Sequence, residues 1–130
     1  MKLITAITVL FMLLPPNPFD SKWAGAYYYD LNFYWCTSHS SCVHEIGHYL
    51  DDMGGMVSQS EDFIEATKEL VEVFPGEESN PYTNKTMELY AHIYEIADGN
   101  PLRLPSSLSQ FYDWDLGKIY IDKLTYVDEH

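Results

Sequence analysis

The chain has 130 residues, of which 46% are hydrophobic and 15% aromatic, and its formal net charge is −13. This length suits one domain with a modest core and leaves no room for two. The negative charge argues against nucleic acid as a partner, because phosphate backbones repel an acidic surface. Cationic peptides would be favoured at an exposed site, although the same charge also serves solubility.

The N-terminus has the pattern of a secretory signal. Residues 3–14 form an apolar run that is too short to span a bilayer comfortably and is followed by a proline-rich break. We therefore predict a targeting segment at residues 1–18 and a single domain at residues 19–130, secreted or anchored outside the cytoplasm. Membrane contact would occur only through this segment, if it is not removed. Alternatively, the apolar run is a core strand and the protein is cytoplasmic.

Residues 23–36 are rich in aromatic side chains, a composition typical of strands. They predict a β-hairpin with its turn at Asp30 or Asn32. Cys36 and Cys42 follow as the only cysteines. In an exported protein they are expected to form a disulfide. The alternatives are two unpaired buried thiols, or a metal site with His39, which would lack a fourth ligand and the usual short spacings.

Three to four helices are predicted downstream from caps and periodicity. The first covers residues 41–53 and the third residues 84–97, each ended by a glycine-containing stretch. The second begins at a capping-box pair and carries an apolar stripe. Its cap pair is Ser58 and Glu61, and its predicted buried residues are Phe63, Ile64, Thr67, Leu70, Val71 and Phe74. A short helix at 106–114 and a strand or extended tail at 118–127 complete an α+β fold.

The first of these helices contains His44-Glu45-Ile46-Gly47-His48. Histidines four residues apart lie on one helix face and can bind the same Zn²⁺. Glu45 is offset by about 100° on the helix and can reach a metal-bound water rather than the metal. A base in this position activates that water, and the spacing is the signature of zinc-dependent peptide hydrolysis.

Features close to the motif favour this interpretation over a solvated helix with two exposed histidines. Gly47 weakens the helix by about 1 kcal/mol but lets another element approach closely. Asp51 and Asp52 follow His48 by one turn, where a carboxylate can hold the imidazole N–H. The preceding hairpin also suits a peptidase, because an extended substrate can pair with a strand edge. A plain core strand is the alternative.

A catalytic zinc needs a third protein ligand. A third histidine six residues after His48 is absent, because that position is Gly54. This leaves a glutamate from a later helix, and Glu88 is the best candidate because Ala91, on the same face, allows close approach. His92, one turn after Glu88, is the alternative ligand. If Glu88 is the ligand, His92 or Glu95 is expected to contact a ligand without binding the metal itself.

The segments HEIGHYLDD, EDFIEATKELVEVF, GEESNPYTN and ELYAHIYE resemble the catalytic domain of anthrax lethal factor and its gluzincin relatives. The resemblance covers about residues 44–94, and the short chain is similar in size to minigluzincins. It implies a minimal zincin-like fold: a β-ribbon and a few helices. It also implies one Zn²⁺ on His44, His48 and Glu88, with Glu45 as general base and Tyr82 as the phenol facing the oxyanion.

The resemblance predicts a zinc-dependent endopeptidase acting on peptide or protein substrates. The alternative is a latent or catalytically silent zinc-binding module that acts as a binding or toxin-like protein. In some minigluzincins a terminal segment occupies the active site, and residues 128–130 could do so here. An ordinary solvated acidic tail is the simpler explanation for those residues.

Overall fold

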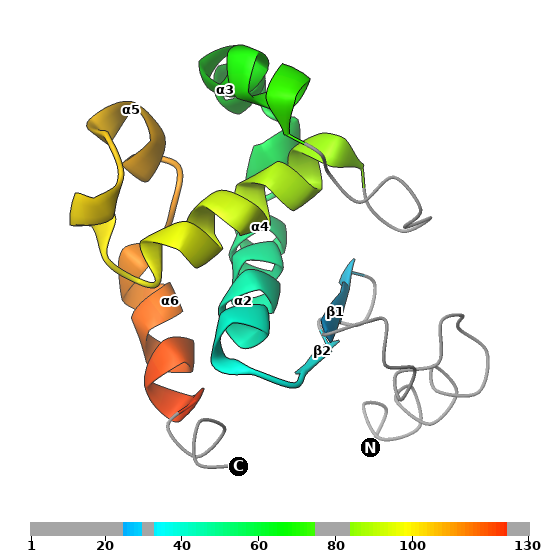
Figure 1. Ribbon diagram of the computed structural model, residues 1–130, viewed down its shortest axis with the longest axis vertical. Helices are drawn as coiled ribbons and strands as arrows, with labels where there is room; N and C mark the ends of the chain where they lie inside the picture. Colours follow the sequence, from blue (N-terminus) through cyan, green and yellow to red (C-terminus); the bar gives the residue numbers. More distant parts are fainter. Residues whose placement is uncertain (1–24, 30–32, 75–83, 125–130) are drawn as a thin grey trace.

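The computed structural model describes residues 25–29, 33–74 and 84–124, and it is mainly helical with one small antiparallel sheet. This agrees with the predicted α+β class. Figure 1 shows α2 between the hairpin on one side and α6 on the other, with α4 crossing it. Within the described residues, no helix is long and apolar enough to span a membrane. The predicted targeting segment, residues 1–18, lies outside them.

The elements follow one another in a simple order. They are β1 (Gly25–Tyr28), β2 (Phe33–Cys36), α2 (His39–Met53), η2 (Val57–Gln59), α3 (Glu61–Val73), α4 (Lys85–Ala97), η3 (Pro101–Arg103), α5 (Ser106–Ser109), α6 (Trp114–Ile121) and η4 (Asp122–Leu124). The described part thus contains five α-helices, where three to four were predicted.

The hairpin pairs β1 with β2, with Gly25 opposite Cys36. Side chains alternate along a strand, so Gly25 and Tyr27 share one face. That face lies against α2, where the Tyr27 hydroxyl donates to Asp52 at 2.7 Å. The two strands confirm the predicted hairpin. The predicted turn residues, Asp30 and Asn32, lie outside the described residues.

A disulfide joins Cys36, at the end of β2, to Cys42 in the first turns of α2. The predicted bond is therefore present. It excludes both alternatives, which were a metal site with His39 and two unpaired thiols. His39, the third residue of that alternative site, has its Nε2 2.9 Å from the Asp98 carboxylate. The covalent link holds the hairpin to the helix that carries the histidine motif.

The contact between α2 and α4 forms the centre of the core, to which α2 contributes Cys42, Val43, Ile46 and Leu50. A Cβ atom on Gly47 would lie 2.9 Å from the Ala91 Cα, closer than real side chains approach. Gly47 and Ala91 therefore face each other, and their small size lets the two helices come together. The close approach expected from each residue is confirmed.

Both helices have local start signals. Ser38 caps α2 through a capping box with Ser41, so the helix begins two residues before the predicted start. Asn84 caps α4 by accepting from the Met87 N–H, as the prediction of a helix over 84–97 required.

The predicted start of α3 was wrong by two residues. Ser60, not Ser58, is the N-cap and accepts from the Phe63 N–H at 3.2 Å. Ser58 is fully buried, and its hydroxyl and N–H both donate to Asp51. The local sequence offers two capping serines, and a long-range partner takes one of them.

The predicted buried face of α3 was also too wide. Phe63 and Thr67 are buried, whereas Ile64 and Leu70 are 44% and 40% exposed. Val71 and Phe74 are partly buried against the core. This helix lies at the edge of the molecule, so only a narrow stripe of it meets other elements (Figure 1).

The C-terminal predictions need correction. The helix expected at 106–114 ends at Ser109, and a new helix begins at Trp114 because the Asp113 side chain accepts from the Leu116 N–H. The strand or extended tail predicted at 118–127 is wrong for the described residues, since the chain is helical to Ile121 and forms η4 after it; residues 125–127 lie outside the described part. This helix packs on α2, where the ring of Tyr120 contacts that of Tyr49.

Candidate metal centre

Helix α2 carries His44 and His48 on one face, as the four-residue spacing predicts. Their ring centroids are 5.0 Å apart with planes at 76°. His48 is buried, whereas the His44 side chain is 19% exposed. His48 therefore lies on the interior side of the histidine pair, and His44 lies on its solvent side.

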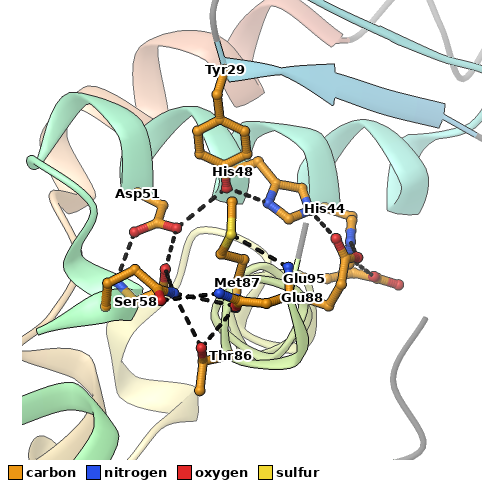
Figure 2. Close-up of polar contacts among 11 residues, drawn as sticks. Tyr29, His44, His48, Asp51, Ser58, Thr86, Met87, Glu88 and Glu95 are labelled. Atoms are coloured by element: carbon orange, nitrogen blue, oxygen red, sulfur yellow. Dashed lines mark hydrogen bonds and ion pairs between the residues drawn. The ribbon is translucent and has the colours of Figure 1, made fainter. Parts of the chain in front are cut away.

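Glu88, in the first turn of α4, completes the group. Its Oε1 lies 3.1 Å from His44 Nε2, and its Oε2 lies 3.0 Å from His48 Nε2. His44, His48 and Glu88 are the group in the described residues whose donor atoms could hold one metal ion. Figure 2 shows the three side chains converging between α2 and α4.

The outer nitrogen of each histidine has its own partner, which turns both Nε2 atoms inward. Glu95 Oε1 lies 3.0 Å from His44 Nδ1, and the Tyr29 hydroxyl lies 2.7 Å from His48 Nδ1. Donors about 2.1 Å from a tetrahedral Zn²⁺ are about 3.4 Å apart. The ligand atoms of the three residues lie within 4.8 Å of one another, so small side-chain movements would bring them to this spacing. Donor types and spacing therefore fit a zinc-sized ion.

The charges of this group are strongly coupled. Burial disfavours a charged imidazole, but the hydrogen bonds to Glu88 and Glu95 outweigh it and raise the pKa of His44 to about 10. Burial also opposes ionisation of Glu88, yet hydrogen bonds from His44 and His48 hold its pKa well below the usual range. The proton on His44 thus supplies the positive charge that a metal ion would otherwise supply at this site, and a metal ion can displace it.

Glu45 lies beside this group without belonging to it. It is 5% exposed, and burial raises its pKa to about 7, against the lowering influence of His48 and His44. The hairpin covers it closely: a Cβ on Gly25 would lie 3.1 Å from Glu45 Oε2 and 2.9 Å from the Trp35 carbonyl. Only glycine fits at position 25, a requirement that the sequence did not reveal.

The predicted supporting residues have different positions. Glu95 contacts His44 as expected. His92 is absent from the donor group, and its ring centroid lies 5.2 Å from that of Phe74. Among the described residues, the alternative of His92 as third ligand is therefore not the arrangement found.

Neither predicted aspartate has a hydrogen bond to His48 among the contacts found. Asp52 accepts from Tyr27, and Asp51 accepts from Tyr29 at 3.3 Å. The Tyr29 hydroxyl occupies the place at Nδ1 that we assigned to a carboxylate. Sequence reasoning missed Tyr29, although it lies two residues beyond Tyr27 in the aromatic run, at the alternate spacing that faces α2.

Two predicted features cannot be placed. Tyr82, the predicted oxyanion donor, and residues 128–130, the candidate latency tail, lie outside the described residues.

Comparison of the chain with protein-family models, with curated proteins and with solved structures gave no match. The geometry of the site and the motif in the sequence therefore carry the functional argument by themselves.

Proposed function

We propose that this chain is a zinc-dependent endopeptidase with one Zn²⁺ held by His44, His48 and Glu88. The observation that carries the proposal is the convergence of both Nε2 atoms on the two oxygens of Glu88, with Glu45 buried next to them. Three protein ligands with a carboxylate outside the ligand set are typical of catalytic zinc, whereas structural zinc has four protein ligands.

Zinc in such a site would polarise the scissile carbonyl and lower the pKa of water. Glu45 would accept the proton of the attacking water and return it to the leaving amine. In the metal-free protein burial raises the pKa of Glu45 to about 7, which makes it a stronger base than an exposed glutamate. Burial under the hairpin also excludes bulk water from competing for the carboxylate. Tyr82 remains the predicted hydrogen-bond donor to the oxyanion.

The hairpin is the proposed binding element for substrate. It lies directly over the motif, with Gly25 against Glu45 and Tyr29 against His48. Extended peptides bind strands by main-chain hydrogen bonds. A net charge of −13 favours cationic peptides over acidic ones.

The test is to compare the wild type with Glu45→Gln on a fluorogenic peptide library, with zinc content measured by elemental analysis. Glu69→Gln, the same change at an exposed position on α3, is the control. We expect wild type and control to bind one zinc per chain and cleave, and Glu45→Gln to keep zinc but lose cleavage. Undiminished cleavage by Glu45→Gln would exclude Glu45 as the base. Zinc binding with no cleavage by the wild type would favour a silent zinc-binding module.

A further inference from the structure

The Tyr29 hydroxyl lies between a predicted zinc ligand and a buried carboxylate. It is 2.7 Å from His48 Nδ1 and 3.3 Å from Asp51 Oδ2 (Figure 2). Tyr29 follows β1 directly, whereas His48 and Asp51 lie one turn apart on α2. The contact therefore connects the hairpin to the inner histidine of the donor group.

Asp51 is held as a hydrogen-bond acceptor. It is fully buried, and it accepts from the Ser58 N–H at 2.7 Å and from the Ser58 hydroxyl at 2.6 Å. The Gln59 amide donates to the same hydroxyl oxygen at 3.0 Å, which leaves the hydroxyl proton for Asp51. Burial raises the pKa of Asp51, and the bonds donated by Ser58 offset part of this rise.

The direction of the protons follows from this arrangement. A carboxylate only accepts, so the Tyr29 O–H donates to Asp51. The Tyr29 oxygen can then accept from His48, so an Nδ1 that carries the proton has a hydrogen-bond partner at 2.7 Å. In the metal-free protein Nε2 faces Glu88 at 3.0 Å, and a bound metal would take the place of the proton there, with the remaining proton of His48 on Nδ1.

The same network continues to the helix that carries Glu88. Gln59 exchanges hydrogen bonds with Asn84, the N-cap of α4, at 3.0 and 3.3 Å and donates to Thr86 at 3.1 Å. Hydrogen bonds thus connect His48 on α2 to the first turn of α4 through Asp51 and through residues from two other segments, the hairpin and η2 (Figure 2). An outer partner of a metal-binding histidine typically improves metal affinity 10- to 100-fold.

We propose that Tyr29 is a positioning residue for zinc: its hydroxyl, oriented by Asp51, holds His48 as the tautomer that offers Nε2 to the metal. The inference rests on the proposed zinc site, and it assigns to the hairpin a role in metal binding in addition to substrate binding. It holds whether or not the bound zinc hydrolyses peptides.

The test compares Tyr29→Phe with Tyr27→Phe in the full chain. Both changes remove one hydroxyl from neighbouring aromatic residues that pack near His48, but the Tyr27 hydroxyl donates to Asp52, whereas the Tyr29 hydroxyl lies against His48 Nδ1. Zinc affinity is measured by competition with a chromophoric chelator. We expect a loss of about 10- to 100-fold for Tyr29→Phe and less than about threefold for Tyr27→Phe.

Histidine ¹⁵N NMR of the zinc-loaded protein gives a readout that a packing defect would not reproduce. We expect a protonated Nδ1 of His48 that exchanges slowly with water in the wild type and in Tyr27→Phe. In Tyr29→Phe this proton should exchange much faster. Asp51→Asn should resemble Tyr29→Phe, and the double variant should lose little more than either single one, because the two residues act as one unit.

Equal zinc affinity in Tyr29→Phe and the wild type, or equal losses in both phenylalanine variants, would overturn the proposal. A wild type that binds no zinc would overturn it together with the proposed function. Zinc binding that depends on Tyr29 in a protein that cleaves no peptide would support the positioning role while contradicting the peptidase.

Discussion

The two sides of the candidate metal centre are built differently. On the His44 side, the supporting carboxylate is Glu95, which comes from α4 like Glu88 and is 31% exposed. On the His48 side, support comes from Tyr29 on the hairpin and from the fully buried Asp51. One side is open to water and the other is closed by tertiary structure.

This difference indicates separate tasks for the two sides. Because water can replace Glu95 as the hydrogen-bond partner of His44, this histidine tolerates changes around it. Buried groups such as His48 and Asp51 have no solvent to replace a lost partner, and an unsatisfied polar group there costs about 1–3 kcal/mol. The closed side therefore fixes the geometry of the donor group, and under the proposed function the open side would leave room for metal and substrate to exchange.

The largest effect is expected from removing the residue that both sides share. Glu88→Ala should abolish zinc binding at micromolar metal, because each oxygen of Glu88 contacts one histidine. The control is His92→Ala on the same helix, outside the donor group. Elemental analysis after dialysis checks the result. One zinc per chain in Glu88→Ala would move the third ligand elsewhere.

A second change tests the helix contact on which both sides depend. In an exposed helix, Gly→Ala stabilises by about 1 kcal/mol. Gly47→Ala should instead destabilise by about 1–3 kcal/mol, because its Cβ would overlap Ala91. Urea unfolding of the zinc-free protein measures the free energy, with Ser40→Ala, exposed on the same helix, as the control. A stabilised Gly47→Ala protein would contradict the close packing.

The protonation of His44 should give zinc-free and zinc-bound proteins opposite responses to pH. Without metal, the folded-state pKa values of His44 and Glu45 are raised from 6.5 to about 10 and from 4.5 to about 7. Their stabilising contributions are complete below the unfolded values and are lost as pH rises through the folded values. The melting temperature in chelator should therefore fall from pH 6 to pH 9.

Zinc binding reverses this trend because it must displace the His44 proton. Affinity should rise about tenfold per pH unit between pH 6 and pH 9. Chelator competition at several pH values measures the slope. A pH-independent zinc affinity would show that His44 is already neutral in the metal-free protein.

The smallest effect is expected at the open side. Glu95→Gln keeps an oxygen acceptor for His44 Nδ1 and lies at a partly exposed position. Zinc affinity should fall only severalfold, below the 10- to 100-fold range expected for a buried outer partner. The same competition assay places Glu95→Gln beside Tyr29→Phe. A larger loss in Glu95→Gln would reverse the comparison between the two sides.

The success of the sequence predictions follows the range of the interactions. The hairpin strands, the helix around His44 and His48, and the α4 helix were predicted because caps and periodicity act over a few residues. The strand predicted at 118–127 and the cap predicted at Ser58 failed for a different reason. In each case the local pattern fits two structures. Packing on α2 favoured a helix over a strand, and the bond from Ser58 to Asp51 left Ser60 as the cap.

The sequence alone determined that two histidines and a glutamate share one helical turn, because the helical period places them there. It also pointed to Glu88 as a partner, through a small neighbour that permits close approach. Only the tertiary structure placed Glu88 against both histidines, turned both Nε2 atoms inward and placed Tyr29 between His48 and Asp51. These contacts join residues 19 to 51 positions apart. Separations of this size are closed by packing of whole elements, which local periodicity does not encode.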